Sequence, residues 1–224
     1  MVHSNRKKLV AEALGTAFLL IGVAGSGIMG EALAGGNTAI ALLANAIATG
    51  CILYVIITTL GPVSGAHFNP VVTVAFALRG EHAWAGVAPY IIAQVIGGIA
   101  GVWAVHLMFD LQILQTSTTV RTGLNQWASE IIATFGLLFV IFGGVKHKPD
   151  TVPTLVALYI TGAYWFTSST SFANPAVTIA RGFTDTFAGI NPNNVLMFIA
   201  AQIVGLMVGH LVVTRLFSDE RRDP

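Results

Sequence analysis

Charged residues are scarce in this sequence. Asp, Glu, Lys and Arg make up only 9% of its 224 residues, whereas 54% are hydrophobic. A soluble domain carries roughly 25% charged residues, so this composition excludes an ordinary soluble protein and indicates a lipid environment. The formal net charge is +1, and no run of basic residues could follow a nucleic-acid groove. We therefore expect no nucleic-acid partner.

Cysteine and recognisable catalytic groups are equally rare. The single Cys51 excludes an internal disulfide. It lies two residues from Thr49, roughly 200° around a helix, and we interpret it as a packing residue. The six histidines lack metal-ligand spacing, and neither a nucleophile–base pair nor a phosphate-binding loop occurs. The sequence predicts no enzyme activity, no cofactor and no metal site.

Long apolar runs are abundant instead. A transmembrane helix needs ~20 apolar residues to cross a ~30 Å hydrocarbon core, and six runs meet that length. They cover residues 9–29, 39–60, 87–108, 127–145, 154–172 and 195–216. The first run is longer than the apolar region of a signal peptide and no small-residue cleavage site follows it. We expect it to remain as a transmembrane span.

Lys and Arg are distributed unevenly between the loops. If the N-terminus is cytoplasmic, the outer segments carry only Arg121 and Arg181. Because basic residues are retained on the cytoplasmic side, we expect a multi-pass protein of the inner (plasma) membrane with both termini inside. The cytoplasmic segments then hold Arg6, Lys7, Lys8, Arg79, Lys146, Lys148, Arg215, Arg221 and Arg222.

The two halves of the chain match each other. The stretch AEALGTAFLL (11–20) aligns with SEIIATFGLL (129–138), and AQVIGGIAG (93–101) aligns with AQIVGLMVG (201–209). Three spans per half is an odd number, so the second half must be inverted relative to the first. We expect a single domain over residues 1–224, built from inverted repeats 1–110 and 127–224 that the polar loop 109–126 joins.

Matched positions in the two halves carry special residues. Glycines recur in a G-x-x-x-G spacing that favours close helix packing in lipid; these are Gly97 with Gly101 and Gly205 with Gly209. Glu12 aligns with Glu130, and a carboxylate within a span is a functional candidate. Two roles fit the pair: a proton relay, or acceptance of hydrogen bonds from a re-entrant loop. The matched positions and the lack of an adjacent His or Lys favour loop bracing.

The pattern Asn-Pro-x-Val-Thr occurs once in each half, in HFNPVVT and FANPAVT. Asn is a strong helix N-cap and Pro is favoured at the first helical position, so Asn69-Pro70 and Asn174-Pro175 predict two helix starts. These helices, ending near residues 78 and 182, are too short to cross a bilayer. Since irregular backbone at membrane depth must lie against protein or a water-filled cavity, we expect them to enter from opposite faces and meet.

Two meeting helix N-termini predict an electrostatic function. Each is equivalent to roughly +0.5 charge, and the Asn amides add hydrogen-bond donors. We expect the non-helical runs 61–67 and 167–173 to supply carbonyl acceptors along the path. A cation or proton would meet a barrier there, whereas a small uncharged hydroxylated molecule would find partners.

Six spans, two half-helices and two Asn-Pro boxes together resemble the aquaporin and aquaglyceroporin (major intrinsic protein) family over nearly the whole chain. The stretches SGAHFNPVVT and SFANPAVT carry the resemblance. It implies an all-α membrane protein with six transmembrane helices plus two re-entrant half-helices in an inverted repeat, assembled as a homotetramer. The family box reads Asn-Pro-Ala. Ala176 keeps that pattern, whereas Val71 departs from it, and its extra methyls should tighten or shift the contact between the boxes.

The resemblance also implies an outer selectivity filter. Its four positions are Thr49, Gly162, Ser171 and Val177. The position of Val177 is normally Arg, and family members usually add one or two aromatic residues to the ring. Without them we expect a wide and weakly polar ring. His67 and Arg181 are further pore-lining candidates, although Arg181 also fits a surface side chain that reaches to the membrane interface.

The resemblance implies a passive channel for small uncharged solutes: glycerol-like polyols, water, arsenite, antimonite and methylated arsenicals. Within the family, the aquaglyceroporins of bacterial arsenic-resistance operons share the enlarged filter without Arg. A plain glycerol or water facilitator is the alternative in the same class. A proton-coupled transporter that uses Glu12 and Glu130, and a junction or adhesion protein that conducts nothing, are alternatives from other classes.

Overall fold

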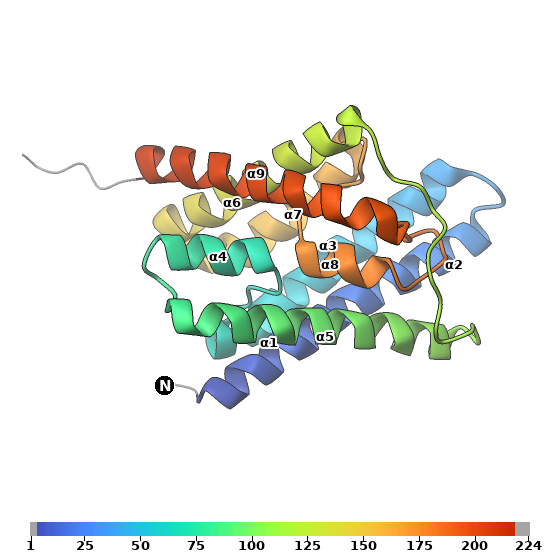
Figure 1. Ribbon diagram of the computed structural model, residues 1–224, viewed down its shortest axis with the longest axis horizontal. Helices are drawn as coiled ribbons and strands as arrows, with labels where there is room; N and C mark the ends of the chain where they lie inside the picture. Colours follow the sequence, from blue (N-terminus) through green and yellow to red (C-terminus); the bar gives the residue numbers. More distant parts are fainter. Residues whose placement is uncertain (1–3, 218–224) are drawn as a thin grey trace, which may run out of the picture.

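The computed structural model describes residues 4–217, and within that range every regular element is a helix (Figure 1). Residues Asn5–Leu20 (α1), a π-helical turn Ile21–Gly25 and Ser26–Leu33 (α2) form one continuous span. The other elements are α3 (Thr38–Ser64), α4 (Pro70–Leu78), α5 (Trp84–Met108), α6 (Leu124–His147), a 3₁₀ turn (Pro149–Thr151), α7 (Val152–Phe166), α8 (Pro175–Arg181) and α9 (Pro192–Leu216).

Five helical segments of the described chain are long and apolar enough to cross a membrane. They are Asn5–Leu33, Thr38–Ser64, Trp84–Met108, Leu124–His147 and Pro192–Leu216. The remaining predicted span corresponds to α7, which has 15 residues and is about 22 Å long at 1.5 Å per residue. The 3₁₀ turn before α7 extends it, so the six expected spans are present and one of them is short.

Two predicted boundaries are wrong. The fifth span was expected to reach residue 172, but α7 ends at Phe166 because the Ser- and Thr-rich stretch that follows forms an irregular loop. The run 61–67 was expected to be non-helical, but α3 continues through Pro62 to Ser64. The helix ends where Gly65 adopts a left-handed conformation with φ of 91°, which glycine tolerates without steric cost.

The two half-helices α4 and α8 lie inside the bundle, between α5 and α9 (Figure 1). Helix α4 contacts α5 and α9, and α8 contacts the same two helices and α4. Around them, α1 packs along α5 and α6 packs along α9. This all-α arrangement of spans and two central half-helices is the predicted fold class.

Glycines set the closeness of these helix pairs. A Cβ at Gly97 would overlap the carbonyl group of Ala13, and one at Gly101 would overlap that of Ala17. In the second half, a Cβ at Gly205 would lie 2.6 Å from the carbonyl oxygen of Ile131. The small residues therefore let α5 and α9 contact the backbones of α1 and α6, which is how side-chain packing holds helices together in lipid.

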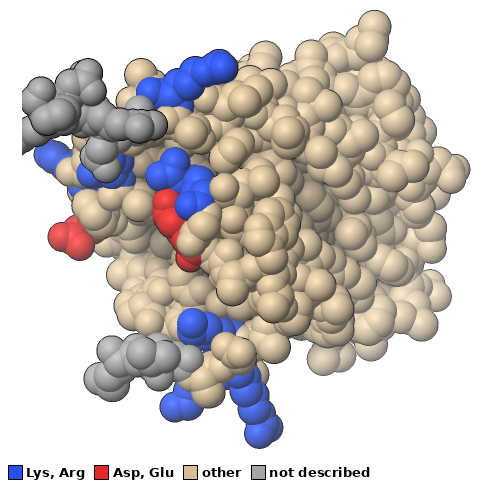
Figure 2. All heavy atoms as spheres, turned by 60° about the vertical axis from the view of Figure 1, so that its left-hand side comes forward, with Lys and Arg blue, Asp and Glu red and all other residues tan. Residues whose placement is uncertain are grey.

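The surface separates charge from apolar area. The start of α1 and the end of α9 lie at the same end of the molecule (Figure 1), as an even number of spans requires. Lys, Arg, Asp and Glu gather at that end, while the rest of the visible surface carries none (Figure 2). The basic residues of the predicted inner group that the structure describes are Arg6, Lys7, Lys8, Arg79, Lys146, Lys148 and Arg215; Arg221 and Arg222 lie outside the described residues.

Candidate functional site

The two half-helices begin at capped N-termini. The Oδ1 atom of Asn69 accepts a 3.0 Å hydrogen bond from the N–H of Val71. The Oδ1 atom of Asn174 accepts bonds of 3.0 and 3.2 Å from the N–H groups of Ala176 and Val177. Pro70 and Pro175 occupy the first helical position, where a missing N–H costs nothing.

The amide of each Asn also reaches the loop of the opposite half. Asn69 Nδ2 donates to the carbonyl oxygen of Ala173 at 2.8 Å, and Asn174 Nδ2 donates to that of Phe68 at 2.8 Å. The two half-helices therefore meet with their N-termini toward each other. A primary amide carries two N–H donors, so each Asn retains one N–H beyond the bond that ties the loops together.

The loops before the half-helices have an unusual backbone. Ala66 and Phe68 in the first loop, and Ser171 and Ala173 in the second, have φ between 47° and 51°. A left-handed conformation costs a residue with a Cβ about 1–2 kcal/mol. Both loops must therefore be held by contacts elsewhere.

Glu12 supplies those contacts for the first loop. Its Oε1 atom accepts hydrogen bonds from Ser64 Oγ (2.7 Å) and the N–H of His67 (3.0 Å). Its Oε2 atom accepts from the N–H of Phe68 (2.7 Å) and from Gln94 Nε2 (2.8 Å). The carboxylate is fully buried and uses both oxygen atoms twice.

Glu130 repeats the same pattern for the second loop. Its Oε1 atom accepts from Ser169 Oγ (2.6 Å) and the N–H of Phe172 (2.9 Å). Its Oε2 atom accepts from the N–H of Ala173 (2.9 Å) and from Gln202 Nε2 (2.7 Å). The two halves thus build equivalent supports from residues at equivalent places in the repeat.

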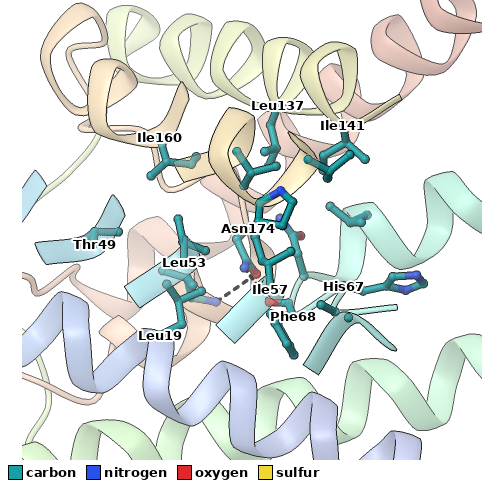
Figure 3. A pocket seen from close by; sticks show the side chains of 18 of the residues that line it. Leu19, Thr49, Leu53, Ile57, His67, Phe68, Leu137, Ile141, Ile160 and Asn174 are labelled. Carbon is teal, nitrogen blue, oxygen red and sulfur yellow. Dashed lines mark hydrogen bonds between the residues drawn. The ribbon is translucent and has the colours of Figure 1, made fainter. Parts of the chain in front are cut away.

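A cavity of about 280 Å³ runs past both Asn side chains. Most of its wall is aliphatic and comes from α1, α3, α6 and α7 at helical spacing. In Figure 3, Thr49 lies at one end of the cavity, His67 at the other, and Asn174 between them. The aliphatic wall includes Leu19, Leu53, Ile57, Leu137, Ile141, Val156 and Ile160. Among the lining residues that the structure describes there is no Asp, Glu or Lys.

Three of the four predicted filter residues line the same cavity. Thr49, Ser171 and Val177 all line the cavity and are buried. The hydroxyl of Tyr164 joins them, 3.2 Å from Thr49 Oγ1. Ser171 Oγ is buried without a hydrogen-bond partner, so it is available to a solute in the cavity.

Gly162 does not join this ring. It is exposed on the outside of α7 and does not line the cavity. The cavity-lining residues of that helix are Val152, Pro153, Val156, Ile160 and Tyr164, which form one stripe at helical spacing. Gly162 lies two residues from Tyr164 and hence about 200° away from that stripe.

Arg181 lies inside the protein and does not reach to the membrane surface. Its side chain is 3% exposed and lines the cavity. The guanidinium carbon is 3.5 Å from the centre of the Phe172 ring, and Nε donates to the carbonyl oxygen of Ala188. The interpretation of Arg181 as a surface side chain is wrong, because aromatic and carbonyl partners within the protein hold it.

His67 lies at the end of the cavity opposite Thr49. Its Nδ1 atom lies 3.1 Å from Thr73 Oγ1, and its ring stacks on Phe76 with centroids 4.8 Å apart. Both rings line the cavity, as do Val145 and Pro149 near the end of α6. The lining therefore extends from the outer ring to the end of α6.

Val71 is buried in the core without lining the cavity, and its neighbour Val72 does line it. Cys51 is exposed on the outside of α3. No group of His, Cys, Asp or Glu within residues 4–217 could hold a metal ion.

Sequence reasoning missed Tyr164, Phe172 and Arg121. Arg121 Nε donates to the carbonyl oxygen of Gly189 at 2.8 Å, and its guanidinium carbon lies 5.4 Å from the centre of the same Phe172 ring that Arg181 covers. One signal was present: Arg121 and Arg181 are the two basic residues of the outer segments, and a cation there needs a partner.

Comparison with known proteins agrees with this geometry. The model of the major intrinsic protein family matches residues 2–172. The aquaglyceroporin AqpS of Rhizobium meliloti (strain 1021) is 55% identical over 215 residues, which are 96% of this chain and 92% of that protein. The chain belongs to the major intrinsic protein family. It is therefore a membrane channel of that family and not an enzyme.

Two other family members extend the comparison. A probable aquaporin of the NIP type from Nicotiana alata is 37% identical over 223 residues, 96% of this chain and 79% of that protein. The X-ray structure of the aquaglyceroporin from Plasmodium falciparum superposes with a TM-score of 0.73 at 19% identity, covering 96% of both chains. At that identity the superposition shows the shared fold.

Proposed function

We propose that this chain is a passive channel for small uncharged solutes: water, glycerol-like polyols and hydroxylated metalloids such as arsenite, antimonite and methylated arsenicals. The cavity that passes Asn69 and Asn174 carries the proposal. It is lined from the outer ring at Thr49 to the inner end at Val145, and both Asn side chains that face it belong to the ends of half-helices.

The chemistry of the wall supports uncharged solutes. Two half-helix N-termini, each equivalent to roughly +0.5 charge, converge where the cavity passes Asn69 and Asn174. The lining offers no carboxylate to offset them, so a cation entering the middle would lose hydration without gaining a counter-charge. A neutral polyol or metalloid hydroxide can accept hydrogen bonds from the Asn amides and place its apolar side against the aliphatic wall.

The composition of the outer ring favours passage of solutes bulkier than water. With Val177 and Ser171 facing the cavity, no guanidinium projects from the position after the second box. Pore diameter and fixed charges set selectivity in such channels. Trihydroxylated arsenite and antimonite are uncharged at neutral pH and similar in shape to small polyols, so a ring that admits polyols admits them as well.

The surroundings of Glu12 and Glu130 favour a role in bracing the two loops. Each carboxylate is fully buried, lies outside the cavity lining and already accepts four hydrogen bonds. A proton relay needs a path between the carboxylate and the solute. The hydrogen bonds instead fix the left-handed loops that present Phe68 and Ala173 to the opposite half.

We also propose a homotetramer in the inner membrane with cytoplasmic termini. The gathering of basic residues at the end of the molecule that holds the start of α1 and the end of α9 supports the orientation by the positive-inside rule. Large hydrophobic residues are exposed along the spans, among them Ile47, Ile96 and Leu158. Lipid or neighbouring subunits cover such surfaces in a membrane.

Stopped-flow measurements on proteoliposomes test the function. Protein-containing vesicles should equilibrate water, glycerol, urea and arsenite faster than empty vesicles of the same lipid. A pH gradient should leave the final solute level unchanged. Rates equal to those of empty vesicles would exclude a channel, and accumulation above equilibrium driven by a pH gradient would indicate a proton-coupled transporter.

A further inference from the structure

We propose that Arg181 supplies the fixed positive charge of the outer filter that Val177 does not provide. It excludes protons and metal cations from a ring that remains wide enough for bulky neutral solutes. The inference rests on the proposed function, because it concerns the selectivity of that same path.

The position of Arg181 follows from the geometry of α8. This half-helix begins at Asn174 in the middle of the protein and ends at Arg181. Val177 and Arg181 are four residues apart, so they lie on one face of the helix about one turn from each other. Both line the cavity, and the guanidinium therefore follows Val177 toward the outer mouth.

The guanidinium is held against the wall of the cavity. It lies over the face of the Phe172 ring at 3.5 Å from the ring centre, a geometry in which a cation is attracted to the aromatic face. Its Nε donates to the carbonyl oxygen of Ala188. Phe172 itself lines the cavity. The charge thus borders the path without extending across it.

Arg181 forms no salt bridge with a carboxylate within the described residues. The buried carboxylate of Glu130 interacts with the guanidinium at longer range, but it already accepts four hydrogen bonds and does not line the cavity. A second cation, Arg121, contacts the same Phe172 ring. Burying a cation without a direct ion pair is costly, and a buried charge acts over a longer distance than one in water because it is less screened. Both facts favour a functional charge.

Ser171 and Tyr164 complete the ring beside Arg181. Ser171 Oγ is buried without a hydrogen-bond partner, and the Tyr164 hydroxyl shares a 3.2 Å contact with Thr49 Oγ1. Neutral donors and acceptors thus line the same cavity that the cation borders. This arrangement separates two tasks, solute hydrogen bonding and cation exclusion, that a projecting arginine would combine.

Arg121 provides a matched control. It contacts the same Phe172 ring and donates to the carbonyl oxygens of Gly189 and Phe187, next to the carbonyl that Arg181 uses. It does not line the cavity. Arg121→Gln therefore removes a guanidinium that braces the same segment, without removing a charge from the path.

The first experiment compares Arg181→Gln with Arg121→Gln in proteoliposomes under an imposed membrane potential. Proton and potassium leak are measured with neutral-solute flux in the same vesicles. We expect Arg181→Gln to raise the leak about tenfold, the lower end of the range over which fixed charge in a cleft changes local ion concentration. The leak is expressed relative to the glycerol flux of the same vesicles, and Arg121→Gln should leave this ratio at the wild-type level.

A second pair of variants leaves Arg181 itself in place. A glutamate at position 177 stands four residues before Arg181 on the same helix face, the favourable order for an ion pair. Val177→Glu should neutralise the guanidinium and raise the leak about as much as Arg181→Gln. Val177→Gln has the same size without the charge and should not raise it.

The outcomes are distinct. An unchanged leak in Val177→Glu would overturn the inference, whether or not Arg181→Gln folds. An equal rise in Arg121→Gln and Arg181→Gln would also overturn it, because bracing of the outer segment would then explain the effect. Absence of neutral-solute flux through the wild-type protein would instead overturn the proposed function.

Discussion

The side-chain amide of Asn174 donates a 2.8 Å hydrogen bond to the carbonyl oxygen of Phe68, 106 residues away along the chain. The same side chain caps α8 through its Oδ1 atom. One residue therefore starts a helix and ties the two halves of the protein together. Different substitutions separate the two roles.

Asn174→Ser should retain the cap and lose the tie, because serine caps helices well but lacks the amide donor. Asn174→Ala should lose both. We expect the thermal unfolding temperature in detergent to be highest for wild type, lower for the Ser variant and lowest for the Ala variant. The lost cap should cost about 1 kcal/mol of stability, and the unsatisfied Phe68 carbonyl about 1–3 kcal/mol. Glycerol flux should fall in both variants.

The equivalent substitutions at Asn69 serve as a second test of the same geometry. They should give the same ranking, because the bond to Ala173 is also 2.8 Å. Wild-type stability and flux in both Asn→Ala variants would contradict the assigned roles.

Glu130 should tolerate Gln better than Ala. Glutamine keeps one acceptor oxygen for the loop, whereas alanine leaves the N–H groups of Phe172 and Ala173 unsatisfied, at about 1–3 kcal/mol each. The fraction of protein that elutes as a single species from detergent, and glycerol flux per molecule, measure the difference. Gln variants of both Glu12 and Glu130 that lose all flux while remaining folded would support a proton-carrying role instead.

Gly97→Ala should destabilise the protein, because a Cβ there overlaps the carbonyl of Ala13. Gly25→Ala is the matched control. Its Cβ would meet side-chain atoms at 3.6 Å or more, an ordinary contact, and alanine within a helix is favoured over glycine by roughly 0.5–1 kcal/mol. The thermal unfolding temperature should therefore fall for Gly97→Ala and stay the same or rise for Gly25→Ala. Equal behaviour of the two variants would refute the close packing of α5 on α1.

Much of this fold could be predicted because its signals are local. Asn-Pro starts a helix at each of its three occurrences, which are the half-helices α4 and α8 and the long helix α9. The pairing of Glu12 with Glu130 follows from matching two segments. The end of α3 was harder, since Gly61-Pro62 is typical of a helix break and the helix continues to Ser64. Tertiary packing stabilises the last turn of α3, and the local sequence does not predict that packing.

The outer ring was predicted only in part, for a geometric reason. Counting back from Asn174 reaches Gly162, but the face of α7 that meets the cavity depends on how the loop after Phe166 folds. The structure turns Tyr164 inward. The role of Phe172 could not be predicted either, because its ring packs against the guanidinium of Arg181. That contact joins residues on different elements.

Replacements at Gly162 and Tyr164 should have different effects. Gly162→Leu adds bulk on the exposed side of α7, where a Cβ would lie 3.8 Å from the Phe166 ring, and should leave glycerol and water flux unchanged. Tyr164→Ala removes a ring that lines the cavity and should raise the permeability of larger polyols relative to water. Flux lost in Gly162→Leu with normal folding would place that residue in the ring after all.

Paired water and arsenite permeability of Val177→Arg tests the central claim most directly. Arginine adds bulk and a planar cation with five donors at a position that lines the outer end of the cavity. We predict that arsenite and glycerol flux fall sharply while water flux falls less, at matched protein density, and that Thr49→Trp acts in the same direction through bulk alone. An unchanged arsenite-to-water ratio in Val177→Arg would show that Val177 is not at the constriction and would contradict the account.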